Sequence, residues 1–157
     1  MDRVAIALGS NVGDRRAHLD YAVAALRALL INVTVSRYYD TVPVGVSGPQ
    51  AMFLNAAAVG ETSLPPRALL EALLAIELER GRERPYVNAP RTLDLDLILA
   101  GDTVVEEPGL VLPHPRFRER RFVLEPLAAV APELRDPVSG RTVAELLSAA
   151  AAGRAGA

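Results

Sequence analysis

The chain of 157 residues contains no cysteine, no lysine and no tryptophan. Without cysteine it can form no disulfide, no thiol nucleophile and no cysteine-ligated zinc site. Without lysine it can neither complete a Walker-A phosphate loop nor form a Schiff base through a side-chain amine. Any phosphate binding must therefore fall to arginine, histidine, backbone amides or a metal ion.

Positive charge, aromatic side chains and long apolar runs are also scarce. The net charge of −2 argues against a nucleic-acid binder that relies on bulk charge. No apolar stretch approaches membrane-spanning length, and no basic leader with a cleavage site opens the chain. We therefore expect a cytoplasmic protein, most simply a monomer, that binds neither nucleic acid nor membrane.

Half of the residues are hydrophobic, which is enough for one well-packed domain. We expect this domain to span residues 1–148, followed by a frayed Ala/Gly tail at 149–157. Hydrophobic periodicity and turn residues predict the elements along it. The expected strands are 3–8, 32–39, 53–60 and 91–100, with a short return strand after Gly101-Asp102. The expected helices are 15–30, 63–81 and 123–130, with a last helix opened by a capping box of Thr142 and Glu145. This order predicts an α+β, ferredoxin-like α/β sandwich in which helices pack on a mainly antiparallel sheet.

The expected helices carry their apolar residues at helical spacing, and all but the helix at 123–130 have a start signal. Asp14 is placed to cap the first helix. On the second helix the predicted buried stripe contains five residues: Leu69, Leu70, Leu73, Leu74 and Ile76. A basic stretch, 116–121, precedes the third helix, and such a cluster most often forms a solvated face.

The most informative segment is Arg91-Thr92-Leu93-Asp94-Leu95-Asp96, in which polar and apolar residues alternate. On a strand Asp94, Asp96 and Ile98 share one face, while the leucines at 93, 95, 97 and 99 share the other. Two neighbouring carboxylates repel unless a cation lies between them, and Mg²⁺ takes such ligands together with substrate phosphates. The triplet alone leaves a magnesium site and a merely solvated edge strand about equally supported.

Motifs at fixed places along the chain strengthen the functional interpretation. They are Gly9-Ser10-Asn11, 41–45, Phe53-Leu54-Asn55-Ala56-Ala57, 82–91, the Asp-Leu-Asp strand, and Leu112-Pro113-His114-Pro115 with Arg120 and Phe122. In this order they resemble the 6-hydroxymethyl-7,8-dihydropterin pyrophosphokinase family of folate biosynthesis, from Val4 to about Pro132. The Pro-Arg-Thr-Leu-Asp-Leu-Asp segment is the most specific part of this resemblance.

The resemblance implies an ATP-dependent diphosphotransferase that passes pyrophosphate from ATP to the pterin hydroxymethyl group and releases AMP. Its implied metal ligands are Asp94 and Asp96, holding two Mg²⁺ ions, and its implied catalytic residues are these two with Arg82 and Arg91. Its implied ATP-binding residues are Arg82, Arg91, His114, Arg120, Glu77 and Ile98. Its implied pterin-binding residues are Thr41, Val42, Val44, Phe53, Asn55 and Phe122.

The chain also departs from the family pattern. Members commonly carry a tryptophan in the loop that covers the pterin, where this chain offers only Tyr86. Phe53 stands where tyrosine is frequent, and Leu74 replaces a polar residue expected near the adenine. We expect the two loops, 40–50 and 82–90, to close over bound substrates.

Two other functions are compatible with parts of the sequence. A different Mg²⁺-dependent phosphotransferase or phosphohydrolase could use the same carboxylates and would yield ADP or phosphate instead of AMP. A non-catalytic ferredoxin-like module for RNA or a regulatory ligand is less well supported, because it needs aromatics spaced for base stacking and the chain has only three Phe and four Tyr.

Overall fold

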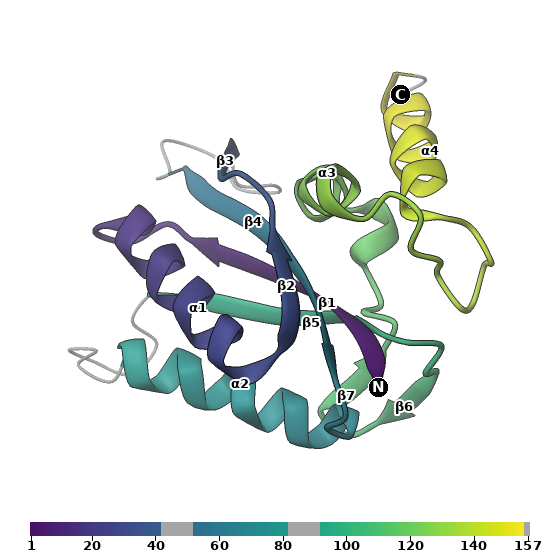
Figure 1. The fold of residues 1–157 in the computed structure, drawn as a ribbon. Helices are drawn as coiled ribbons and strands as arrows, with labels where there is room; N and C mark the ends of the chain where they lie inside the picture. Colours follow the sequence, from purple (N-terminus) through teal and green to yellow (C-terminus); the bar gives the residue numbers. More distant parts are fainter. Residues whose placement is uncertain (42–51, 82–91, 156–157) are drawn as a thin grey trace.

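The computed structural model describes residues 1–41, 52–81 and 92–155, which form a sheet with helices on both faces (Figure 1). The elements in chain order are β1 (Asp2–Ser10), α1 (Arg15–Leu29), β2 (Ile31–Val35), β3 (Tyr39–Thr41), β4 (Phe53–Thr62), α2 (Pro66–Gly81), β5 (Asp94–Ala100), β6 (Val105–Glu107), β7 (Leu110–Leu112), the 3₁₀ turn η1 (Phe117–Glu119), α3 (Arg121–Val130) and α4 (Val143–Ala155). The main sheet has the order β2-β4-β1-β5, with β3 also paired to β4, and every pair is antiparallel. The predicted ferredoxin-like fold is confirmed.

Helices α1 and α2 cover one face of the sheet and enclose the larger hydrophobic core (Figure 1). The central strand β1 supplies Val4, Ile6 and Leu8 to this core at every second position, as strand geometry requires. Leu19 and Leu73 face them from the two helices and are completely buried. Each such side chain contributes about 1.5–3 kcal/mol through removal from water, so this face anchors the fold.

The opposite face is covered over only part of its length. There α3, α4 and η1 pack through Phe117, Leu124 and Val143 onto strand residues that include Ala5 and Val59. Toward the far end of β1 the same face carries Ala7 and Gly9, which line an open cavity rather than a helix interface. Among the residues that the structure describes, one end of this sheet face is therefore open to a ligand.

The helix start signals read from the sequence are present. The Asp14 carboxylate accepts a hydrogen bond from the Ala17 amide at 3.1 Å and caps α1. The Thr142 and Glu145 side chains exchange hydrogen bonds with each other's backbone amides, so the predicted capping box forms at the start of α4.

The strand predicted at 32–39 is wrong in extent, because β2 ends at Val35 and a separate strand, β3, begins at Tyr39. The side chain of Ser36 explains the interruption. Its hydroxyl accepts a hydrogen bond from the Ala57 amide at 3.0 Å and donates one to the Arg37 carbonyl. A serine hydroxyl that takes over such backbone partners offers the chain an alternative to a continuous ladder.

The strict alternation predicted for β5 holds to Ile98 and fails at Leu99. The β1–β5 register shifts between Ala5 and Ile6, whose partners are Leu99 and Leu97, so Ile98 forms a bulge. Leu99 therefore packs with Ile98 in the smaller core, and not on the face of the preceding leucines as the sequence suggested. A bulge adds one residue to one strand and reverses the side-chain faces beyond it.

The predicted return strand after Gly101-Asp102 is also wrong. β6 does not pair with β5; it pairs with β7 across a turn at Pro108-Gly109, in a separate two-stranded sheet. Arg67 on α2 holds this turn by hydrogen bonds to Glu107 and to the Pro108 carbonyl.

Two further expectations concern the helices. Leu74 does not belong to the buried stripe of α2, because it is 46% exposed. Helix α4 runs to Ala155 and so includes much of the segment predicted to fray. The single-domain boundary at 148 and the fraying of the tail stay predictions. No helix within the described ranges is long and apolar enough to cross a membrane.

A histidine between α1 and α2 predicts how stability depends on pH. His18 Nδ1 accepts a hydrogen bond from Arg80 Nε at 2.9 Å. Burial, followed by the charge of Arg80, lowers the pKa of His18 below 6.5, although a hydrogen bond with the Val12 backbone and the nearby Asp14 oppose this. The unfolded chain then binds a proton at His18 more readily than the folded protein, so the contribution of His18 to stability is complete above pH 6.5 and is lost as the pH drops through the lowered pKa.

We expect the free energy of unfolding, measured in urea, to decrease between about pH 7.5 and about pH 5.5. His18→Gln should remove part of this decrease, because glutamine cannot take up the proton. His114, the other histidine, acts in the same direction, so His114→Gln is the matched comparison. An unchanged pH dependence in the His18 variant would contradict the assignment.

Candidate active site

The cavity has a floor of small residues on the central strand. The register pairs Gly9 with Asn55 of β4 on one side and with Asp94 of β5 on the other. Two residues earlier, Ala7 pairs with Ala57 and with Asp96. Because these rows share one face of the sheet, the Asn55 amide and the two carboxylates project on the same side, separated only by glycine and alanine.

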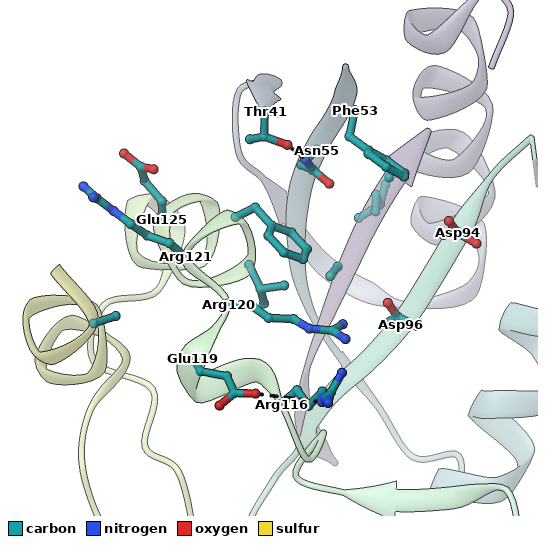
Figure 2. A pocket seen from close by; sticks show the side chains of 16 residues that line it. Thr41, Phe53, Asn55, Asp94, Asp96, Arg116, Glu119, Arg120, Arg121 and Glu125 are labelled. Carbon is teal, nitrogen blue, oxygen red and sulfur yellow. Dashed lines mark hydrogen bonds and ion pairs between the residues drawn. The ribbon is translucent and has the colours of Figure 1, made fainter. Parts of the chain in front are cut away.

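Strands β1, β4 and β5 together with η1 and α3 enclose a cavity of about 1080 Å³ (Figure 2). Its described lining consists of Ala7, Leu8, Gly9, Thr41, Phe53, Asn55, Asp94, Asp96, Arg116, Glu119, Arg120, Arg121, Phe122, Val123, Glu125 and Ala150. Carboxylates, guanidinium groups and aromatic rings therefore face a single space. A volume of this order suits substrates of small-molecule size.

The two aspartates of β5 lie on the cavity side, Asp94 half-buried and Asp96 exposed (Figure 2). Two residues along a strand span about 6.5–7 Å, which leaves room for cations between carboxylates and ligand oxygens. At the free edge of β5, Glu77 of α2 accepts a hydrogen bond from the Leu95 amide at 2.6 Å. This hydrogen bond satisfies the Leu95 amide at the edge of the sheet. It also fixes β5 at the residue between the two aspartates.

These carboxylates suit a metal ion that arrives with a phosphate ligand. Within residues 1–41, 52–81 and 92–155 no group of three or more Asp, Glu, His or Cys side chains could hold a metal ion. Mg²⁺ in phosphate-transferring sites typically takes only one or two protein carboxylates and completes its shell with water and phosphate oxygens. Asp94 and Asp96 match that donor set.

The cationic wall of the cavity comes from η1 and the start of α3. Figure 2 shows the Arg120 and Arg116 side chains extending toward the side of β5 that carries Asp96. The Arg120 guanidinium lies 5.7 Å from the centre of the Phe122 ring, a cation–π contact that orients both side chains. Guanidinium groups pointing at a carboxylate-lined floor can clamp a polyphosphate bridged to it by cations.

His114 is not among the lining residues of the cavity, but it lies near enough to the cationic wall for Arg120, Arg116 and Asp96 to act on its charge. Its backbone amide donates a hydrogen bond to the Ile98 carbonyl at 2.9 Å, and its Nδ1 accepts one from the Arg116 amide at 3.3 Å. Burial lowers the pKa of His114, Arg120 and Arg116 lower it further, and Asp96 opposes them. The imidazole is therefore neutral near pH 7 and carries its proton on Nε2. This N–H can donate a hydrogen bond to an anionic oxygen.

The opposite wall combines an amide with an aromatic ring. Asn55 is 6% exposed, and its Nδ2 donates a short hydrogen bond to Thr41 Oγ1. A Cβ added at Gly9 would lie 3.1 Å from Asn55 Oδ1, so glycine gives the amide its space. Phe53 and Phe122 add flat apolar surface to the same cavity. Such a combination can bind the edge and the faces of a planar heterocycle.

Most of the predicted site residues within the described ranges meet at this cavity. It is lined by Thr41, Phe53, Asn55, Asp94, Asp96, Arg120 and Phe122. Glu77 lies instead at the edge of β5, and the Ile98 side chain is 1% exposed in the smaller core. Any contact of Ile98 with a ligand must therefore use its backbone. Arg82, Arg91, Val42, Val44 and Tyr86, like most of the two predicted lid loops, lie outside the described residues.

Nine of the described lining residues were not among the site residues expected from the sequence, and three of these nine form the floor or the cationic wall. Ala7 and Gly9 form the floor, and Arg116 joins the cationic wall. The signal for the first two was the small-residue alternation at the end of an otherwise apolar strand. For Arg116 there was none, because nothing in the run 116–121 distinguishes arginines that face the cavity from those that do not.

Comparison with known proteins agrees with this geometry. Residues 5–132 match the family model described as 7,8-dihydro-6-hydroxymethylpterin-pyrophosphokinase. The chain is 44% identical over 151 residues to the 2-amino-4-hydroxy-6-hydroxymethyldihydropteridine pyrophosphokinase of Pseudomonas aeruginosa, covering 95% of this chain and 92% of the relative. It is 47% identical over 131 residues to the enzyme of the same name from Bacillus subtilis, covering 82% of this chain and 78% of the relative.

A similar fold is found in solved structures. The wild-type HPPK-DHPS of Plasmodium falciparum matches with a TM-score of 0.76 at 14% identity, covering 94% of this chain and 44% of that one. This chain therefore spans less than half of that solved protein. At this identity the likeness supports the fold alone.

Proposed function

Because the chain belongs to the 7,8-dihydro-6-hydroxymethylpterin-pyrophosphokinase family, we propose that its cavity binds ATP and 6-hydroxymethyl-7,8-dihydropterin together. The enzyme transfers the pyrophosphoryl group of ATP to the hydroxymethyl oxygen of the pterin, giving AMP and the pterin diphosphate for folate synthesis. One observation carries the assignment of the site: a single cavity is lined by paired carboxylates, convergent guanidinium groups and an amide with aromatic rings.

We assign the pterin to the wall formed by Thr41, Phe53, Asn55 and Phe122. The Asn55 Oδ1 faces Gly9 across a space that a methyl group would fill, so a flat ring can approach the strand there. Asn55 already donates to Thr41 and keeps acceptor capacity for an N–H on the pterin edge. Phe122, held by its contact with Arg120, offers a face for stacking.

We assign the triphosphate to the space between the aspartates of β5 and the cationic wall. Two Mg²⁺ ions held by Asp94 and Asp96 would neutralise the phosphate oxygens and orient the attacking alcohol. Arg120 binds phosphate oxygens from the opposite side, and His114 donates through Nε2. As the bond at the β-phosphorus forms, charge builds between these groups, which are fixed in place before the reaction.

The assignments of Arg82 and Arg91 to phosphate binding and catalysis remain proposals. Both lie outside the described residues. The Arg91 position immediately precedes the described Thr92, whose carbonyl accepts a 2.6 Å hydrogen bond from the buried Ser10 hydroxyl. This bond holds the chain where it enters β5, beside the two carboxylates. The proposed role of Glu77 is to support β5 from the edge, through the Leu95 amide.

We further propose that the enzyme works as a monomer in the cytoplasm, where ATP is available, and binds neither nucleic acid nor membrane. The net charge of −2 supports the exclusion of nucleic acid. Light scattering at several protein concentrations tests the oligomeric state.

Product analysis tests the reaction itself. The purified protein is incubated with ATP, Mg²⁺ and 6-hydroxymethyl-7,8-dihydropterin, and the nucleotides and pterins are separated. We expect AMP and pterin diphosphate in equal amounts, and neither product when EDTA removes Mg²⁺. ADP or inorganic phosphate in place of AMP would assign the same carboxylates to a different phosphotransferase or phosphohydrolase.

A further inference from the structure

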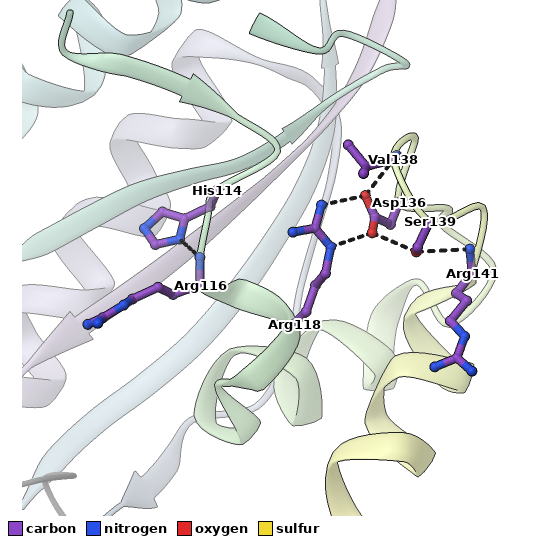
Figure 3. A network of polar contacts seen from close by, with 7 residues as sticks. All are labelled: His114, Arg116, Arg118, Asp136, Val138, Ser139 and Arg141. Atoms are coloured by element: carbon purple, nitrogen blue, oxygen red, sulfur yellow. Dashed lines mark hydrogen bonds and ion pairs between the residues drawn. The ribbon is translucent and has the colours of Figure 1, made fainter. Parts of the chain in front are cut away.

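Three arginines occupy alternate positions along the turn that builds the cationic wall. Arg116 and Arg120 line the cavity, whereas Arg118 between them does not. Figure 3 shows the Arg118 side chain directed away from His114 and Arg116, toward the loop between α3 and α4. The expectation that the basic cluster forms a solvated face is therefore wrong for Arg118.

Arg118 meets a carboxylate that has no exposed surface. The Asp136 side chain is 0% exposed, and both its oxygens accept hydrogen bonds from the Arg118 guanidinium, one from Nε and one from Nη2 at 2.9 Å. Asp136 also accepts from the Ser139 hydroxyl at 2.7 Å and from the Val138 amide at 3.0 Å (Figure 3). The Asp136 carboxylate thus accepts hydrogen bonds from its own loop, through Ser139 and Val138, and from η1, through Arg118.

The pKa shifts of Arg118 and Asp136 favour the charged form of both groups. Burial raises the pKa of Asp136, but the hydrogen bonds from Arg118, Ser139 and Val138 outweigh it and hold that pKa well below its usual range. The hydrogen bond to Asp136 raises the pKa of Arg118. Bidentate pairing of this kind fixes the orientation of the guanidinium as well as its position.

Backbone hydrogen bonds within the turn between His114 and Arg120 connect Arg118 to the residues on either side of it. The Glu119 amide donates to the Arg116 carbonyl at 3.2 Å, and the Arg120 amide donates to the Phe117 carbonyl at 3.2 Å. Phe117 is completely buried in the smaller core, and the Arg118 guanidinium lies 5.1 Å from its ring centre. A turn held at Phe117 and Arg118 has little freedom to rotate the side chains on either side of it.

We propose that Arg118 and Asp136 are positioning residues that hold Arg116, Arg120 and His114 in the geometry required to bind the nucleotide phosphates. This role rests on the proposed placement of ATP against the cationic wall. The pair touches no substrate. It acts by preventing rotation of the η1 turn, so its loss should weaken ATP binding far more than pterin binding. Of the proposed pterin wall only Phe122 follows this turn, whereas Thr41, Phe53 and Asn55 lie on β3 and β4.

The test compares Arg118→Gln, Arg118→Lys and the double variant Arg118→Gln/Asp136→Asn. The double variant leaves no unpaired buried carboxylate, so it keeps the test open if the single glutamine variant does not fold. Arg3→Gln is the matched control, because Arg3 binds Glu133 at 2.6 Å in an exposed pair that links β1 to the same α3–α4 connection away from the cavity. Calorimetry measures the affinity for a non-hydrolysable ATP analogue with Mg²⁺ and, separately, for the pterin; steady-state assays give both KM values.

We expect Arg118→Gln and the double variant to weaken binding of the ATP analogue and to raise the KM for ATP by about tenfold to a hundredfold, the scale of an ångström-sized misplacement. Pterin affinity should change less than about twofold. Lysine should restore part of the loss, because it keeps the charge without the bidentate geometry. Arg3→Gln should leave both affinities unchanged.

Equal weakening of both ligands, or unchanged ATP binding in a folded double variant, would show that the pair serves stability alone and would overturn the proposal. Product analysis of the wild-type protein separates this result from a failure of the proposed function. If the wild type releases ADP, the reaction assignment fails, whereas the difference between nucleotide and pterin binding in the variants still decides the positioning role.

Discussion

Asp96→Asn is expected to lower kcat by about a thousandfold or more, the upper end of what removal of one electrostatic catalytic group costs. Asparagine keeps the size and one oxygen of the side chain but removes the charge that Mg²⁺ requires as a ligand. Asp96 is exposed on the cavity face of β5. Its neighbour in the register is Ala7, so no buried partner is left unpaired. The free energy of unfolding should therefore change by less than about 0.5 kcal/mol.

The measurement is initial rates of AMP formation at saturating ATP and pterin, with urea unfolding on the same preparation. Asp94→Asn should show a comparable loss of kcat. Glu125→Gln is the matched control, because Glu125 contributes another carboxylate to the cavity lining but lies on α3, away from the two aspartates (Figure 2). Its kcat should stay within about twofold of the wild type. The two-metal assignment would be wrong if either aspartate variant retained a near-normal rate.

A second large effect is expected at Arg120. Arg120→Gln should reduce kcat/KM for ATP by about a hundredfold to a thousandfold, equivalent to about 2.7–4 kcal/mol of lost transition-state stabilisation. The reason is geometric, since the Arg120 guanidinium projects toward the side of β5 that carries Asp96, whereas Arg121 at the start of α3 extends along the helix beside Glu125. The variant also loses the contact with Phe122, so pterin binding should weaken slightly.

Arg121 provides the control at the next position. It has the same charge and lies at the rim of the same cavity, but its side chain is exposed and in Figure 2 it extends along α3 beside Glu125. Arg121→Gln tests whether any positive charge near the cavity is enough to support the reaction with ATP. If the two variants lose activity equally, the effect is long-range attraction of ATP, and it should disappear at high ionic strength. A loss confined to Arg120 supports direct contact with phosphate.

The candidate site could be predicted from the sequence to the extent that strand alternation governs it. Asp94 and Asp96 face the cavity because residues two apart on a strand share a face, and that rule needs no tertiary information. The same rule failed at Leu99, because the bulge at Ile98 comes from the pairing with β1 and leaves no mark in the sequence of β5 alone. The prediction also failed at Leu74, because α2 carries more leucines than it buries: Leu69 and Leu73 are completely buried, whereas Leu74 is 46% exposed.

The sequence by itself determined the main strands and helices, the capped starts of α1 and α4, and the residue types available for phosphate binding. These depend on local properties: periodicity, capping groups, and the absence of lysine and cysteine. Only the tertiary structure decided that Arg116 also faces the cavity while Arg118 is bound to buried Asp136, because that choice depends on a partner 18 residues away. Likewise, Asn55, Gly9 and Asp94 become one row only when β4, β1 and β5 pair, since a hydrogen-bonded register joins residues that chain distance keeps apart.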